Sequence, residues 1–237
     1  MTLTRTVGSY VMGPTSDRSK WVSWENFIVT TNPDDSHTAM SMSRFPGNSM
    51  IRHVVQTADK DFSPMDGVTR FFTDQEYQGF LVRRVVEDTV HSFVMYPDGR
   101  PVDEAALPRG GSDLVLGYHP TLVEGWKFIK ADRSIKGPQP VRILSSSPTW
   151  NGGVMGHGAE VSLQVEYLGE EDVSVPAGTF RGHHYLWHTG NIDGDIEVWT
   201  TGQDEICARV IGHAKGVTYE LQTCEITEFG DTLEFDF

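Results

Sequence analysis

Apolar and polar residues alternate within Glu160–Gly169, and this pattern limits what the chain can fold into. Every second residue from Val161 to Tyr167 is apolar, so an extended strand would bury these side chains on one face. Half-buried strands of this kind are typical of antiparallel sheets. The segment Val217–Ile226 shows a similar pattern. The sequence therefore predicts a sheet with one buried and one wet face.

Short segments rich in β-branched and aromatic residues follow one another along the rest of the chain, with turn signals between many of them. Pro97-Asp98-Gly99 is typical of a hairpin turn, because proline fixes φ and glycine accepts positive φ. The segments that we predict as strands are Trp21–Thr31, His37–Arg44, Ser49–Thr57, Thr69–Thr73, Gln78–Glu87, Thr89–Tyr96, Val141–Ser145, Glu160–Glu170, His183–His188, Asp195–Thr200, Ala208–His213 and Val217–Glu228.

Helical signals are sparse. Thr121–Lys130 carries apolar residues at helical spacing after Pro120, which predicts one short helix, and Asp103–Leu107 is a second candidate. Many sequential antiparallel strands favour a barrel, half-barrel or sandwich, because closure or strong curvature protects the sheet edges. We therefore expect a mainly β protein, with an antiparallel curved sheet that forms a barrel or half-barrel and with one or two short helices.

The chain has 237 residues, a length that single β-rich domains often reach. The polar segment Ala131–Gln139 is interpreted as a long loop inside one domain, so residues 1–237 are predicted to form a single domain. The tail 228–237 mixes acidic residues with aromatic ones. We expect it either to fray or to dock on a neighbouring subunit of a homodimer.

Acidic residues outnumber basic ones by 33 to 19, which gives a net charge of −14. A chain this acidic has no general attraction to phosphate backbones or anionic lipids, so neither a nucleic acid nor a membrane is an expected partner. The segment Met1–Trp21 contains no apolar run of signal-peptide length. We therefore expect a cytoplasmic protein in which Cys207 and Cys224 stay reduced.

The C-terminal third carries the run Val-Ser-Val-Pro-Ala-Gly-Thr-Phe at Val173–Phe180, followed by Glu197–Thr200, Ala208–Val210 and Tyr219–Leu221. Over roughly Glu160–Glu225 this order resembles a bacterial β-rich family of unknown function with a Val-Pro-Ala-Gly-Thr-Phe turn. That family is similar to the curved half-barrels of lipoprotein carriers and lipocalin-like proteins. The resemblance implies a lipocalin-like fold and no particular reaction.

Signatures of cofactor binding are missing. The sequence has no Gly-x-Gly-x-x-Gly after a strand, no Walker A motif, no His-Glu-x-x-His and no Gly-x-Ser-x-Gly, so we expect no cofactor. Ser145-Ser146-Ser147 and Cys207 are nucleophiles by residue type alone.

His184 and His188 stand four residues apart on one predicted strand, about 13 Å from each other, so they cannot chelate one metal ion. No metal site is therefore predicted, although other strands could add ligands to one of these histidines.

Histidine and tyrosine point instead to acid–base chemistry, because an imidazole in a half-buried site exchanges protons near neutral pH. Pro120 biases His119 towards an extended conformation that aims its ring off the scaffold. The predicted catalytic residues are His119 and His184, supported by Tyr118, Tyr185 and His188.

Substrate contacts are predicted from arginines on apolar strands and from aromatic side chains. A guanidinium that faces a cavity orients a carboxylate or phenolate, and aromatic rings suit a flat apolar ligand. The residues assigned to this role are Arg52, Arg83, Trp126, Trp187, Trp199 and Tyr219.

Two functions from different classes follow, and a third is kept open. The first is a cofactor-independent lyase, isomerase or dehydratase that uses His/Tyr acid–base chemistry on a hydrophobic, aromatic small molecule. The alternative is a non-catalytic protein that binds an apolar small molecule or lipid in a β-barrel cavity. The third is a scaffold whose acidic surface and aromatic tail mediate oligomerisation.

Overall fold

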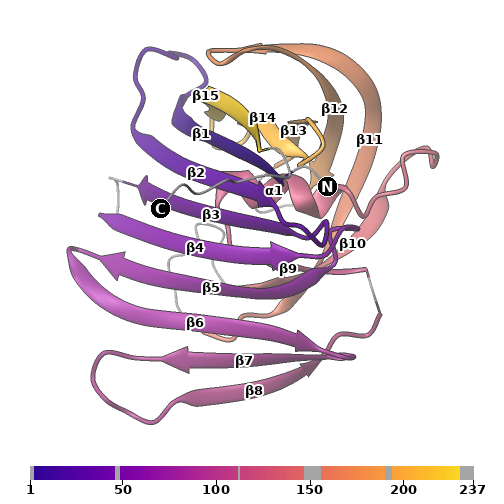
Figure 1. Ribbon diagram of the computed structural model, residues 1–237. Helices are drawn as coiled ribbons and strands as arrows, with labels where there is room; N and C mark the ends of the chain where they lie inside the picture. The colour runs from indigo at the N-terminus through magenta and orange to yellow at the C-terminus, as the bar shows by residue number, and fades with distance from the viewer. Residues whose placement is uncertain (1–2, 46–48, 112, 147–155, 190–193, 230–237) are drawn as a thin grey trace, which may run out of the picture.

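One continuous sheet, antiparallel except between β9 and β10, organises the protein, as a computed structural model shows for residues 3–45, 49–111, 113–146, 156–189 and 194–229 (Figure 1). The sheet has 15 strands. The strands and the single helix of the described ranges are β1 (Leu3–Pro14), β2 (Ser23–Thr31), β3 (His37–Phe45), β4 (Met50–Ala58), β5 (Pro64–Thr73), β6 (Glu76–Val86), β7 (Thr89–Met95), β8 (Asp103–Pro108), β9 (Leu114–Gly117), α1 (Thr121–Phe128), β10 (Gln139–Ser145), β11 (Glu160–Val175), β12 (Gly178–His188), β13 (Ile196–Thr201), β14 (Ile206–Gly212) and β15 (Val217–Phe229).

The strand order places the two ends of the described chain side by side in the middle of the sheet. From this seam β1–β8 run outward as one limb, and β15–β9 run outward as the other. Residues Leu3 to Pro14 of β1 pair with Phe229 to Val217 of β15. The edges β8 and β9 are not paired with each other, so the sheet curves without closing. The predicted curved antiparallel sheet is confirmed, and it is a half-barrel rather than a closed barrel.

Helix α1 lies inside the curve of the sheet, with strands of both limbs around it (Figure 1). Seven of its eight residues are buried, so the helix has no solvent-exposed stripe. Leu122, Trp126 and Phe128 join the main hydrophobic core with Tyr10 and Phe27 from the first limb. The helix therefore fills the space that the inward-facing side chains of the two limbs leave between them.

Strands β1, β8 and β9 are additional to the predicted strands. Asp103–Leu107, a helix candidate in the sequence, is strand β8 and pairs with β7. The sequence of β1 shows no apolar–polar alternation, because its inward-facing residues include Thr4, Thr6 and Gly8 as well as Tyr10. A side chain at position 8 would strike the ring of Phe27, so glycine is needed there for the close approach of β2.

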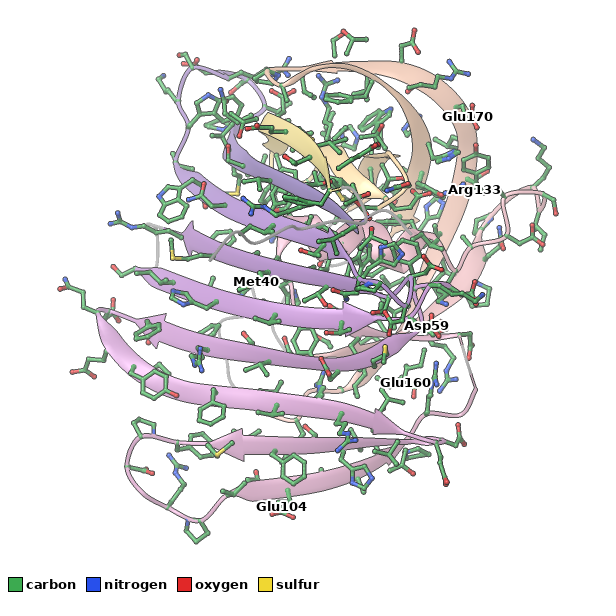
Figure 2. The ribbon with its side chains drawn as sticks, in the orientation of Figure 1. Met40, Asp59, Glu104, Arg133, Glu160 and Glu170 are labelled. Atoms are coloured by element: carbon green, nitrogen blue, oxygen red, sulfur yellow. The ribbon has the colours of Figure 1, made fainter. Side chains whose placement is uncertain are left out.

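The Pro-Ala-Gly turn forms the tip of a long hairpin of β11 and β12, two strands of the second limb that curve into an arch (Figure 1). Gly178 has φ of 140°, a backbone conformation that favours glycine. The tip is fastened to the sheet, because the amide of Ala177 donates to the carbonyl of Leu221 at 3.0 Å. Figure 2 labels Glu170 on this arch.

No helix in the described part of the chain is long and apolar enough to span a membrane. Residues 230–237 lie outside the described ranges, so the two expectations for the tail stay predictions.

The packing of α1 predicts the effect of Gly125→Ala. Alanine favours a helix over glycine by about 1 kcal/mol. However, the new Cβ would stand 1.9 Å from the carbonyl oxygen of Glu205, which is backbone and cannot swing away. We expect the clash to prevail and to lower the free energy of unfolding by about 2 kcal/mol or more, measured by urea denaturation. Gly156→Ala is the control, because the nearest atom to its Cβ would be 3.9 Å away. Equal stability of the two variants would contradict the packing described here.

Candidate functional site

The β9–α1–β10 unit is the one place in the described sheet where neighbouring strands run parallel. Gly117 ends β9 opposite Ser145, which ends β10, and the helix that connects the strands begins at the same edge. Carboxyl ends of parallel strands and a helix amino end therefore meet at one place. Open α/β sheets hold their ligands in the same kind of position.

His119 lies at this edge, in the short segment between β9 and α1. The extended conformation predicted from Pro120 is wrong, because the φ of His119 is 67°. This left-handed region is unusual for a residue other than glycine and often marks functional sites. The side chain is part-buried, and its Nε2 lies 3.1 Å from Oγ of Ser145. The amide of Ser146 donates to the carbonyl of Gly117 at 2.7 Å, which fixes the two strand ends relative to each other. The structure thus joins a histidine and a serine from different strand ends.

Two buried arginines of the first limb donate hydrogen bonds to backbone carbonyls at this edge of the sheet. Arg83 on β6 is fully buried and donates to the carbonyls of Leu144 at 2.8 Å and Ser145 at 2.7 Å, and also to that of His157. Arg52 on β4 donates to the carbonyl of Tyr118 at 3.3 Å. Both guanidiniums were predicted to face a cavity and a ligand. They face the interior, but the partners found for them are mainly backbone carbonyls.

Charge and burial control the protonation of His119. Burial lowers the pKa of its imidazole well below the usual range, and the nearby charges of Arg52, Lys127 and Arg83 lower it further. The imidazole is therefore neutral at physiological pH and has a nitrogen that can accept a proton. Lys127 is itself held at 2.5 Å by the carboxylate of Glu124.

Glu25 of β2 caps the amino end of α1. Its two carboxylate oxygens accept hydrogen bonds from the amides of Thr121, at 2.8 Å, and Leu122, at 3.1 Å. Burial raises the pKa of Glu25 to about 7, although the two amides and the charge of Arg52 oppose the rise. The sequence offered no signal for Glu25, because the residue stands 96 positions before the helix that it caps.

Within the described chain, neither Tyr118 nor Tyr185 forms a hydrogen bond with the side chain of His119. Tyr118 is buried, and the guanidinium carbon of Arg83 lies over its ring, 5.5 Å from the ring centroid. Tyr185 packs on Phe128 at 5.2 Å, and its hydroxyl accepts a hydrogen bond from Nε of Arg133 at 2.8 Å. Tyr219 lines a separate small hollow beside Glu25, whose volume of about 10 Å³ has room for one water molecule.

His184 and His188 lie on the other face of the sheet from the helix. Tyr185 packs on α1, so its neighbour His184 must point away from it. His184 stacks on Trp199 with ring centroids 4.2 Å apart, and His188 lies 3.3 Å from Asp195. The structure therefore does not bring His119 and His184 together, because the two rings lie on opposite faces. What each residue contributes by itself stays a prediction.

The two remaining predicted aromatics belong to the core around α1. Trp126 donates from Nε1 to the carbonyl of Asp204 at 3.0 Å, and Trp187 lies 5.6 Å from the ammonium of Lys127.

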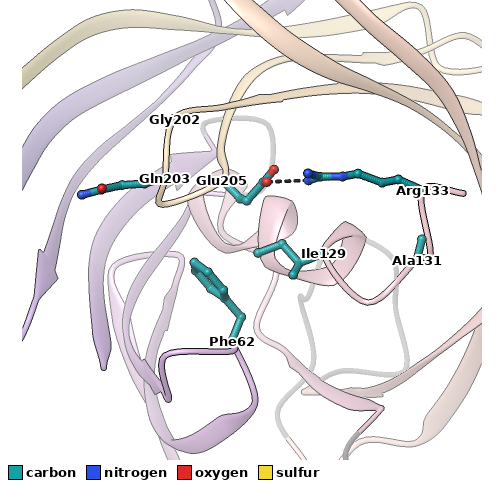
Figure 3. Close-up of a pocket in the computed structure, with 7 residues that line it drawn as sticks. All are labelled: Phe62, Ile129, Ala131, Arg133, Gly202, Gln203 and Glu205. Atoms are coloured by element: carbon teal, nitrogen blue, oxygen red, sulfur yellow. Dashed lines mark hydrogen bonds and ion pairs between the residues drawn. The ribbon is translucent and has the colours of Figure 1, made fainter. Parts of the chain in front are cut away.

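A pocket opens at the carboxyl end of α1, away from His119 (Figure 3). Its volume is about 310 Å³, at the lower end of the range for small-molecule sites. Arg133 crosses it and pairs with Glu205 at 2.5 Å, and Figure 2 also labels Arg133, beside β11. No residue that the sequence assigned to catalysis or substrate binding lines this pocket, whose wall is made by Phe62, Ile129, Ala131, Arg133, Gly202, Gln203 and Glu205.

Comparison with known proteins supports the fold. No family model and no curated protein matches the sequence. Among solved structures, the chain is similar to a β-barrel-like protein of the domain of unknown function DUF1849 from Brucella abortus, with a TM-score of 0.59, 10% identity and coverage of 96% of this chain and 98% of that one. A DUF1089 family protein from Pseudomonas aeruginosa aligns with a TM-score of 0.44 and 15% identity over 81% of this chain and 90% of that one. The expected resemblance to bacterial β-rich proteins of unknown function is thus confirmed at the level of the fold.

The raised pKa of Glu25 predicts a stability change around neutral pH. Between about pH 4.5 and 7 the folded protein keeps a proton on Glu25 that the unfolded chain has lost. The contribution of Glu25 to stability therefore falls as the pH rises through this window. Glu25→Gln imitates the protonated form. We expect the unfolding free energy of the wild type, minus that of the variant, to fall by about 2–3 kcal/mol from pH 5 to pH 8 in urea titrations. A difference that stays constant over this range would mean that the pKa of Glu25 is ordinary.

Proposed function

We propose that the protein is a cofactor-independent enzyme in which His119 moves a proton to and from a small aromatic molecule that carries an anionic group. The reaction class is that of a lyase, isomerase or dehydratase. One observation carries the proposal: the neutral imidazole of His119 is held 3.1 Å from the Ser145 hydroxyl, at the edge where two parallel strands end.

A histidine that acts as a general base needs an unprotonated ring nitrogen in a fixed orientation. The Ser145 hydroxyl supplies the orientation, because its contact with Nε2 restricts rotation of the ring. The left-handed backbone at His119 is a second indication, since such a conformation costs about 1–3 kcal/mol and persists where the surrounding structure holds it. In this mechanism His119 takes a proton from the substrate and returns it at another atom.

The charges around His119 favour an anionic substrate. Arg52, Arg83 and Lys127 all act on its imidazole, and each lowers the pKa by its positive charge. Preorganised positive charge in a part-buried site stabilises the negative charge that develops when a proton leaves the substrate. Aromatic carboxylates and phenols with an acidic C–H bond are therefore the substrate class that we propose.

The test is deuterium incorporation from D₂O into a panel of aromatic carboxylates and phenols, followed by proton NMR. This readout detects proton abstraction even where no net product forms. We expect His119→Gln to lower the exchange rate by about 10²–10⁴-fold, the usual size of a general acid–base contribution. His53→Gln is the matched control, because His53 follows Arg52 on β4 and points to the opposite face. An unchanged rate in His119→Gln, or no exchange with any panel member, would overturn the proposal.

A second function, ligand binding without chemistry, is favoured by the pocket at the carboxyl end of α1. Its wall combines the aromatic ring of Phe62 with the guanidinium of Arg133, which is 35% exposed. A ring and a cation on one wall suit an aromatic molecule with a carboxylate. This reading places the ligand away from His119 and needs no proton transfer.

Binding at this pocket predicts that Arg133→Met weakens the affinity for an aromatic carboxylate by about tenfold, through loss of a charge-assisted hydrogen bond. Calorimetric titration measures the change. Arg181→Met is the control, because Arg181 is 61% exposed on β12 and does not line the pocket. Equal affinities in the two variants would exclude this pocket as the binding site, and the affinity should not respond to His119→Gln.

A further inference from the structure

We propose that His184 and Glu197 form a binding site for a divalent transition-metal ion such as Zn²⁺, on the face of β12 and β13 turned away from α1. The site is independent of the proposed reaction. Nε2 of His184 faces Oε2 of Glu197 at 3.4 Å. Two ligand atoms at about 2.0–2.1 Å from a tetrahedral zinc ion lie about 3.3 Å apart, so the two donors already have the spacing of zinc ligands.

The free nitrogen of His184 supports this assignment. Nε2 is buried and makes no hydrogen bond to any described residue, although it lies next to a carboxylate oxygen. Buried polar atoms without a partner are rare in native proteins and call for an explanation such as a bound ion. A metal cation between this nitrogen and the carboxylate oxygen would be attracted to both.

The surroundings hold the imidazole as metal-binding histidines are usually held. Nδ1 of His184 lies 3.1 Å from Oε1 of Glu171, the carboxylate that would fix the tautomer and leave Nε2 for the ion. Glu171 is held in turn by the indole N–H of Trp199 at 2.6 Å. Trp199 stacks on the His184 ring at 4.2 Å, which restricts its tilt.

A third ligand is within reach. No three histidine, cysteine or acidic side chains of the described chain converge as a metal cage in their present rotamers. However, the second carboxylate oxygen of Glu197 lies 2.8 Å from Nε2 of His213, which is 52% exposed in the turn after β14. A rotation of the His213 side chain would bring this nitrogen to an ion on Glu197, and water would complete the coordination. Imidazole and carboxylate ligands together suit zinc, nickel and copper.

The same arrangement recurs at His188, which lies 3.3 Å from Asp195 and 3.5 Å from Glu166. Asp195 is close in sequence to residues 190–193, which lie outside the described ranges, so the proposal rests on His184 alone.

The experiment uses the full chain without a histidine tag. Zn²⁺ is titrated by calorimetry, and Ni²⁺ is titrated while tryptophan fluorescence is recorded. We expect His184→Gln and Glu197→Gln each to weaken Zn²⁺ binding by about tenfold or more. His183→Gln is the matched control, because His183 is the preceding residue of β12 and points to the opposite face, where it contacts Tyr167.

Fluorescence locates the ion. At saturating Ni²⁺, Trp199→Phe should remove most of the quenching, because Trp199 is the indole stacked on His184. Circular dichroism checks that each variant is folded. The proposal is overturned if the wild type does not bind Zn²⁺, if His184→Gln and Glu197→Gln bind it as the wild type does, if His183→Gln weakens binding equally, or if Trp199→Phe leaves the quenching unchanged.

Discussion

The amino end of helix α1 is capped by the buried carboxylate of Glu25 and not by a side chain next to it in sequence. The other polar contacts of the interior depend on this capping interaction. The N-cap residue of α1 is Pro120, which makes no side-chain hydrogen bond to the helix. Amides at the start of a buried helix need acceptors, since water cannot reach them. Glu25 provides both oxygens from a strand of the first limb. A carboxylate thus had to enter the core, and the charge of Arg52 nearby partly compensates for its burial.

The arginines then hold the two limbs together. The sheet is open between β8 and β9, so backbone pairing does not join these edges. Arg83 spans from β6 to the carbonyls at the end of β10, and Arg52 spans from β4 to the carbonyl of Tyr118. Guanidinium groups suit this task because they carry five donors in a fixed plane. Hydrogen bonds from arginine side chains to backbone carbonyls therefore hold the two limbs of this half-barrel together. In a closed barrel, pairing between the edge strands has this role.

The same interior explains why His119 differs from the other histidines. It lies at the strand ends that the arginines hold, and it experiences their charge. His184 and His188 lie among carboxylates on the opposite face. The sheet therefore lies between His119 and these two histidines.

The sequence by itself determined twelve of the 15 strands, because a period of two follows directly from extended backbone geometry. It determined their buried faces only in part: Val161 was predicted to be buried and is 41% exposed. It also determined the helix after Pro120 and the Pro-Ala-Gly turn, since both depend on residues that are neighbours in the chain. β1 escaped prediction because its inward face uses threonine and glycine, which carry no apolar signal.

Only the tertiary structure decided which residues form a site. His119 meets Ser145 across 26 positions, and Glu25 meets the helix across 96. No spacing rule connects such pairs, because their distance depends on how the limbs curve and not on local geometry. The curvature of the limbs also separates His119 from His184. The alternation of side chains along β12 places His184 and Tyr185 on opposite faces of the sheet. The packing of Tyr185 on Phe128 shows which of these faces is turned towards the helix.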